Sequence, residues 1–180
     1  EYSTDVMPQA NGSNPGYSAY DSDVAKCQIQ DAKANGSDVV IVYFHFGNEY
    51  SHSPNPDQEK MAHEVIDYGA DAVLGSHPHV TQGIEMYNGK PIFYSLGNFI
   101  FDMSNSATHI AYIVKIDFVN DTGECTVYPV IISGYLPYFM GPDEGTSLLN
   151  SLYPQCDDLE ITPEGTGKLY FNLTGDTNES

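Results

Sequence analysis

Residues 69–80, the stretch that decides the fold, read Gly69-Ala70-Asp71-Ala72-Val73-Leu74-Gly75-Ser76-His77-Pro78-His79-Val80. The short apolar run 72–75 predicts a strand, and two imidazoles one residue apart follow it directly. On an extended segment, side chains two residues apart point the same way, so His77 and His79 are expected to face one site. Pro78 stiffens the step between them.

The segment upstream repeats this order of strand and polar loop. Residues 38–44 form a continuous β-branched and aromatic run, which predicts a strand covered on both faces, and His45 follows it. Between the two strands, Asn55, Pro56 and Gln58 predict the start of a helix that ends at Gly69. A right-handed crossover places the loops after both strands on the same edge of the sheet. We therefore expect His45 to lie beside the two histidines of residues 76–80.

Three imidazoles at the ends of neighbouring strands predict a metal centre, because imidazole suits Zn, Fe and Mn ions. The metal ligands are expected to be His45, His77 and His79. Glu49, in the loop after His45, is the candidate catalytic residue. It would orient a metal-bound water or fix a ligand histidine, and the alternative is a surface carboxylate. His52, His63 and His109 lack this setting, and no functional role is expected for them.

The rest of the chain surrounds this unit with one helix and several strands. A helix is predicted over 21–35, a hairpin over 84–94 with an Asn-Gly turn at 88–89, and a strand pair over 111–119 and 124–133. Residues 134–180 are turn-rich, with a short strand at 170–173. Asn98, in a Gly-Asn turn, is the candidate substrate-binding residue, and the alternative is a turn-forming asparagine.

Composition excludes some classes of partner. The 25 acidic and 6 basic side chains give a net charge of −19, which opposes binding to nucleic acid and to anionic lipid. Three cysteines without a Cys-x-x-Cys pair argue against a zinc cluster, and each is expected to be a small buried side chain.

Three segments together resemble the CapA-type poly-γ-glutamate capsule synthesis proteins of bacteria. Residues 45–50 (HFGNEY) resemble the family's HWGxEY, residues 69–80 its GADxVxGxHPHV, and residues 94–102 (YSLGNFIFD) its YSLGNFxFD. Phe46 replaces the usual tryptophan and Ser76 a frequent histidine. The resemblance spans about residues 20–133. It implies an α/β fold, a metallophosphoesterase-like α/β/β/α two-sheet sandwich around two metal ions, in which the positions matching His45, His77 and His79 are ligands.

The resemblance also implies that part of this sandwich is missing. The motifs Asp-x-His, Gly-Asp and Gly-Asn-His/Glu, which precede these segments in that fold, do not occur in residues 1–44. Residues 1–133 are therefore expected to be the C-terminal portion of the domain, with 134–180 as an extension packed on it. We expect this piece alone to be inactive, and its partner to be the missing N-terminal half, another chain or a second copy.

The resemblance implies three alternatives for function. The first is synthesis or export of poly-γ-glutamate with a metallophosphatase-like site that binds two divalent ions (Mn, Fe or Zn). The second is a metal-dependent phosphoesterase with another substrate, and the third is a non-catalytic scaffold that recruits other capsule synthesis proteins. An extracytoplasmic location is expected, either secreted or held by a membrane anchor outside this chain.

Overall fold

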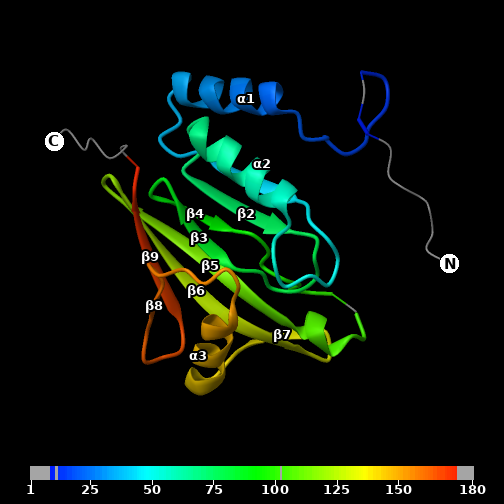
Figure 1. The fold of residues 1–180 in the computed structure, drawn as a ribbon, viewed down its shortest axis with the longest axis vertical. Coiled ribbons are helices and arrows are strands. Elements are labelled where there is room, and N and C mark those ends of the chain that lie inside the picture. Colours follow the sequence, from blue (N-terminus) through cyan, green and yellow to red (C-terminus); the bar gives the residue numbers. More distant parts are fainter. Residues whose placement is uncertain (1–8, 11, 102, 174–180) are drawn as a thin grey trace.

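Two β-sheets and three α-helices make up the part of the chain that the computed structural model describes, residues 9–10, 12–101 and 103–173 (Figure 1). The first half contains α1 (Ser22–Ala34), β1 (Ile41–His45), α2 (Pro56–Asp67), β2 (Ala72–Ser76), β3 (Ile84–Tyr87) and β4 (Lys90–Phe93). The second half contains the 3₁₀ turn η1 (Ser106–His109), β5 (Ile110–Val119), β6 (Thr122–Ser133), β7 (Leu136–Phe139), α3 (Pro142–Ser151), β8 (Glu160–Ile161) and β9 (Gly167–Asn172).

The first sheet carries the predicted strand–helix–strand unit. Its strands lie in the order β1-β2-β4-β3, and β1 pairs with β2 in parallel so that His45 lies opposite Ser76. Helix α2 begins with the predicted capping box, in which the side chain of Asn55 accepts from the backbone of Gln58 and the side chain of Gln58 accepts in return. The crossover therefore brings both histidine loops to one edge of the sheet, as predicted.

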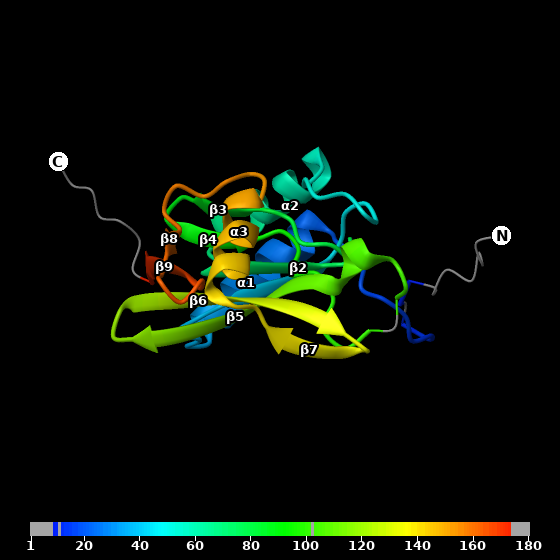
Figure 2. The same cartoon turned by 90° about the horizontal axis from the view of Figure 1, so that it is seen from below.

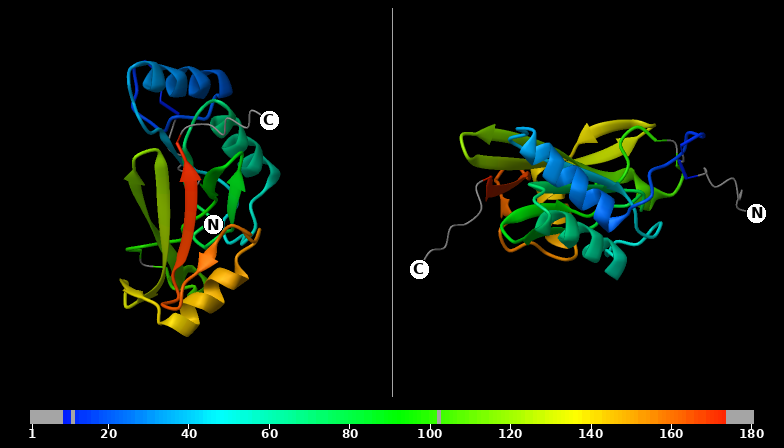
Figure 3. Two further views of the ribbon diagram at one scale, coloured as in Figure 1. Left: turned by 90° about the vertical axis from the view of Figure 1, so that its left-hand side faces the viewer. Right: turned by 90° about the horizontal axis from the view of Figure 1, so that it is seen from above.

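Two hydrophobic clusters hold the layers together. Helices α1 and α2 lie on one face of the first sheet, where Ile29, Val65 and Val73 belong to the first cluster (Figures 1 and 3). The other face packs on the second sheet, whose strands lie in the order β5-β6-β9-β8 with β7 beside β6. Phe93 of the first sheet and Leu169 of the second share this second cluster. The stacked sheets and flanking helices form the predicted mixed α/β sandwich (Figure 2).

The predicted burial of β1 on both faces is wrong for the described residues. Ile41 and Tyr43 are 42% and 60% exposed, whereas Val42 and Phe44 pack against the helices. Strand β1 is the edge of its sheet, and Tyr43 shares a face with its register partner Leu74, which packs toward the second sheet. The second sheet therefore leaves the β1 end of that face uncovered.

The C-terminal third has more regular structure than its turn-rich sequence predicts. Helix α3 and strand β7 lie in the segment that the sequence predicts to be turn-rich, and β9 begins three residues before the predicted strand. The proposed boundary at residues 133–134 lies between β6 and β7, which are paired strands of one sheet.

Two further features bear on the sequence predictions. All three cysteines are free thiols, and Cys125 is buried as predicted, while Cys27 is exposed. Among the described residues, no helix is long and apolar enough to cross a membrane.

Candidate metal centre

Three imidazole rings from two loops meet at the C-terminal edge of the first sheet. The ring centroids of His45 and His77 are 4.7 Å apart, and those of His77 and His79 are 6.1 Å apart. His45 ends β1, while the other two follow β2, so the parallel register of β1 and β2 is the cause of this convergence. The juxtaposition predicted from the strand–helix–strand pattern is therefore present in the structure.

The loop that carries His77 and His79 is not extended, and in this respect the sequence prediction is wrong. Both residues have positive φ angles, 106° and 61°, on either side of Pro78. Left-handed backbone is uncommon for a residue with a Cβ atom and costs about 1–3 kcal/mol. The bent loop still directs both rings to the same edge, but through two left-handed residues rather than through the alternation of a strand.

His79 is the most constrained of the three rings. Its Nδ1 lies 2.9 Å from Oδ1 of Asn98, and the amide of Asn98 donates to the carbonyl of Thr108. The Asn98 oxygen can only accept, so His79 donates its Nδ1 proton and keeps a lone pair at Nε2. The rings of Tyr50 and Phe101 lie 6.3 and 5.2 Å from that of His79. Asn98 thus contacts a proposed ligand rather than forming a turn alone.

The surroundings of His45 favour its neutral form. Partial desolvation of the ring, and then the positive charges that His77 and His79 would carry, lower the pKa of His45 below its ordinary value of 6.5. Ser76 adds only a long contact, with its Oγ 3.4 Å from Nδ1 of His45. A neutral imidazole has the free lone pair that a metal ligand needs.

A buried amide pair anchors the loop that follows β1. The side chain of Gln58 donates to Gln82 at 2.9 Å, and both are fully buried. Gln82 donates in turn to the carbonyls of Ser51 and Ser53 at 2.9 and 3.0 Å. The loop that carries Glu49 and Tyr50 is therefore tied to the segment after β2. Sequence reasoning missed this role of Gln82, because nothing local marks it.

Glu49 lies on the exposed side of this loop. No described residue forms a hydrogen bond or an ion pair with its carboxylate, so the structure places it in the predicted loop without a fixed partner. The three histidines for which no functional role is predicted make contacts away from the three candidate ligands. His52 contacts the carbonyl of Thr81, His63 contacts Glu85, and His109 contacts the carbonyl of Met103.

The donor set fits part of a metal centre. A neutral His45 and an Nδ1-bonded His79 present the imidazole form that Zn, Fe and Mn accept. Within the described ranges, however, no three His, Cys, Asp or Glu side chains are grouped closely enough to hold one ion. The three rings would therefore hold an ion only together with further ligands.

Comparison with known proteins identifies relatives of one kind. Residues 2–103 match the family model described as bacterial capsule synthesis protein PGA_cap. The chain is 40% identical over 129 residues to the PGA biosynthesis protein CapA of Bacillus subtilis (strain 168), which covers 71% of this chain and 34% of that protein. It is also 40% identical over 109 residues to the capsule biosynthesis protein CapA of Bacillus anthracis, covering 59% of this chain and 26% of the relative. A probable polyglutamine synthesis accessory protein of Mycobacterium tuberculosis is 33% identical over 90 residues.

The region that matches the family model, residues 2–103, includes His45, His77 and His79. The chain spans about a third of the Bacillus subtilis relative and about a quarter of the Bacillus anthracis relative.

Proposed function

The chain belongs to the PGA_cap family of bacterial capsule synthesis proteins, and from this premise we propose that it is the C-terminal part of a metal-binding domain that works in the synthesis or export of poly-γ-glutamate. The observation that carries the proposal is the convergence of His45, His77 and His79 from two loops at one sheet edge. The assignment to poly-γ-glutamate synthesis is supported by the relatives that are named for capsule and PGA biosynthesis. We also propose that the domain acts outside the cytoplasm, as the resemblance to CapA-type proteins implies.

Each residue of the centre has a distinct task in this proposal. His45, His77 and His79 hold two divalent ions together with ligands from the rest of the domain. Bound ions of this kind supply Lewis-acid stabilisation of charge that develops on a phosphoryl oxygen. Asn98 fixes the ring of His79 through the Nδ1 proton. Glu49, free on the loop after β1, orients water or substrate at the open side of the site.

The edge of the first sheet supports a proposal for the partner. β1 has an unpaired edge among the described strands, and Ile41 and Tyr43 expose apolar surface beside it. An open edge with apolar side chains pairs readily with another strand. We propose that the N-terminal half of the domain, or a partner chain that supplies it, adds strands here and brings carboxylate ligands to the histidines.

The decisive experiment uses the full-length parent protein. In a strain that makes poly-γ-glutamate, His79→Ala is expected to abolish polymer production, while His52→Ala, further along the loop after β1, leaves it intact. A parallel assay of purified parent protein with Mn²⁺ or Zn²⁺ and p-nitrophenyl phosphate tests for phosphoester hydrolysis. If His79→Ala is present at wild-type abundance and polymer production is normal, the proposal that the metal centre is needed for this function is wrong.

A second candidate function is a scaffold that recruits other capsule synthesis proteins without catalysis. The observation in its favour is that no three potential ligands among the described residues surround one point. The two functions diverge in the same experiment. A scaffold keeps polymer production in His79→Ala, whereas hydrolysis of p-nitrophenyl phosphate that His79→Ala abolishes favours a phosphoesterase.

A further inference from the structure

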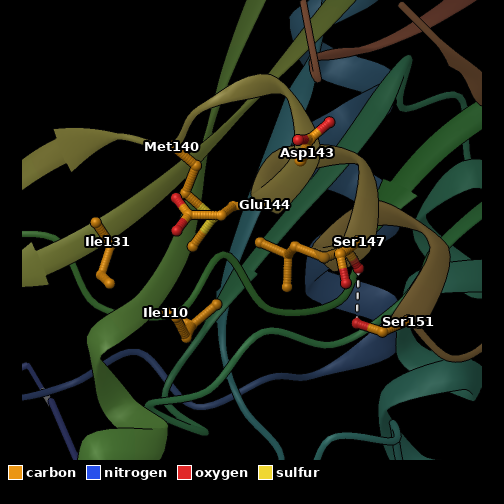
Figure 4. Close-up of a pocket in the computed structure, with 8 residues that line it drawn as sticks. Ile110, Ile131, Met140, Asp143, Glu144, Ser147 and Ser151 are labelled. Atoms are coloured by element: carbon orange, nitrogen blue, oxygen red, sulfur yellow. Dashed lines mark hydrogen bonds between the residues drawn. The ribbon is translucent and has the colours of Figure 1, made fainter.

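A pocket in the C-terminal third lies outside the region that matches the family model. It has a volume of about 470 Å³ and opens between the β5–β6 pair and helix α3 (Figure 4). Its lining is mainly apolar on the sheet side and polar or acidic on the helix side. The apolar group comprises Ile110, Ile131, Met140 and Leu148, and the polar group comprises Asp143, Glu144, Ser147 and Ser151. A volume of this size is typical of pockets that accept a ligand or an anchoring side chain.

The apolar floor continues the face that forms the inter-sheet core. Alternation along a strand puts Ile110 on the same face as the buried Tyr112, and Ile131 on the same face as Val127. Ile110, Ile131 and Tyr138 are cross-strand partners, so they form one row. Ile131 and Tyr138 are 39% and 52% exposed. Helix α3 therefore covers only part of this face and leaves an apolar strip beside the pocket.

Strand β7 enlarges the exposed apolar area. Leu136 is 57% exposed and lies on the same face of β7 as Tyr138, and β7 pairs with β6 alone among the described strands. Contiguous exposed apolar and aromatic surface is typical of interaction sites. The pocket and the strip thus form one surface, which we call the β7 surface and define by Ile110, Ile131, Leu136, Tyr138, Met140, Asp143 and Glu144.

Charge on the rim restricts the partner. Asp143 and Glu144 stand in the first turn of α3, where negative side chains are stabilised by the helix dipole, and the chain as a whole carries −19. A second copy has little positive charge to offer. Five of the six basic residues, all lysines, form ion pairs, and Lys26 lies over the ring of Tyr68. Two copies repel each other, and the lysines of a second copy already contact other side chains of that copy. Both effects disfavour self-association at this surface.

We propose that the β7 surface binds a basic amphipathic peptide segment of another protein. One apolar side chain of the segment lies in the pocket against Ile110 and Ile131, and flanking lysine or arginine side chains pair with Asp143 and Glu144. The remaining apolar side chains of the segment lie along β7. This inference stands apart from the metal centre, because it uses none of the histidine loops.

A model peptide tests the proposal on the whole 180-residue chain. A fluorescein-labelled short peptide of alternating leucine and lysine is titrated with the protein, and its anisotropy is followed. Saturable binding is expected, with no binding by the same peptide carrying glutamate for lysine. At least about 10-fold weaker binding is expected with serine for leucine, since an apolar anchor then no longer fills the pocket. Absence of saturable binding by the leucine–lysine peptide would overturn the proposal.

Protein variants separate this surface from general attraction to an acidic protein. The double variant Asp143→Asn, Glu144→Gln is expected to weaken binding by about 3- to 10-fold, because two exposed charge pairs are lost. The matched control is Asp57→Asn, Glu59→Gln, which removes the same charge from the first turn of α2. Equal weakening by both double variants would overturn the proposal, because the attraction would then be non-specific.

The apolar side of the surface has its own variant. Ile131→Thr keeps a β-branched residue in β6 and removes apolar contact, so weaker peptide binding is expected while the thermal unfolding midpoint changes little. Unchanged peptide binding by this variant would contradict the proposed pocket. Phosphatidylcholine vesicles test whether the β7 surface binds a lipid membrane instead of a peptide. Co-sedimentation of the chain with such vesicles that Ile131→Thr abolishes would show a lipid contact and overturn a peptide partner.

Discussion

Asp71 offers the sharpest test of how the first sheet is held together. Its carboxylate, buried at the start of β2, accepts from Lys33 of α1 at 2.5 Å and from Lys90 of β4 at 3.1 Å. It also accepts from the backbone amide of Val40, which precedes β1, at 2.9 Å. Lys90 in turn donates to the carbonyls of Asn172 and Leu173 at the end of β9. One carboxylate therefore connects α1, β1, β4 and the second sheet.

The change Asp71→Asn keeps the shape of the side chain and removes its charge. Breaking a buried ion pair costs about 3–5 kcal/mol, because the remaining charge is left without a partner. The side chain of Lys33 is 33% exposed and can regain water, whereas that of Lys90 is 13% exposed and cannot readily do so. Discounting the first pair for solvent screening leaves an expected loss of about 2–4 kcal/mol in the free energy of unfolding.

Urea unfolding followed by circular dichroism at neutral pH measures this loss. The matched control is Asp117→Asn, which removes the carboxylate from the exposed pair with Lys115 and is expected to cost no more than about 0.5 kcal/mol. A loss below about 1 kcal/mol for Asp71→Asn, or one equal to that of the control, would refute the reasoning that Asp71 is the common anchor of these elements.

Three further predictions concern single residues. Asn98→Ala is expected to lower the Zn²⁺ affinity of the full-length parent protein about 10- to 100-fold, measured by equilibrium dialysis, because His79 loses the acceptor that fixes its ring. Gly75→Ala is expected to destabilise the fold by at least about 2 kcal/mol in urea unfolding, because a Cβ atom there would lie 2.1 Å from the carbonyl oxygen of Tyr94. Burial raises the pKa of the Cys125 thiol to about 12. The unfolded thiol ionises from about pH 9, so the folded chain binds more protons above that pH and its stability falls as pH rises. Cys125→Ala is expected to remove about 1 kcal/mol of the decline between about pH 9 and pH 10.

Each of these predictions has a control or a contrary result. Asn98→Asp keeps the acceptor oxygen and should retain most of the Zn²⁺ affinity, so equal losses for both variants would count against an orienting role. Gly12→Ala, where a Cβ atom has no neighbour within 4 Å, should change stability little. An alkaline decline that is identical with and without the thiol would show that Cys125 is not buried as described.

The elements with strong local signals could be predicted from sequence. The capping box of Asn55 and Gln58, the Asn-Gly turn at 88–89 and the crossover each depend on neighbours in the chain. Helix α3 could not, because its N-cap Gly141 makes no side-chain cap and Gly145, a poor helix former, stands inside it. That helix forms through packing. The carbonyl of Gly165 comes so close that a Cβ atom at residue 145 would lie 2.3 Å from it.

The site was predictable to the level of strand ends. The approach of His45 to His77 follows from parallel pairing of two strands, which the hydrophobic pattern indicates. The left-handed backbone at His77 and His79 could not be predicted, since residues with a Cβ atom rarely adopt it. The contacts of Tyr50 and Phe101 with His79 depend on how three loops fold over one another, and no sequence period encodes that. The exposure of one face of β1 could not be predicted either, because an apolar run does not show whether other elements pack on both of its faces.

We propose that His45, at the end of β1, and His77 and His79, in the loop after β2, bind metal together. The direct measurement is equilibrium dialysis of the full-length parent protein against Zn²⁺, with metal analysis, for the wild type and for single alanine variants of the three residues. His52→Ala, further along the loop after β1, serves as the control. Each of the three variants is expected to lose bound Zn²⁺, while the control retains it. Unchanged Zn²⁺ binding by His45→Ala, beside a loss in the other two, would show that the two loops do not share a site.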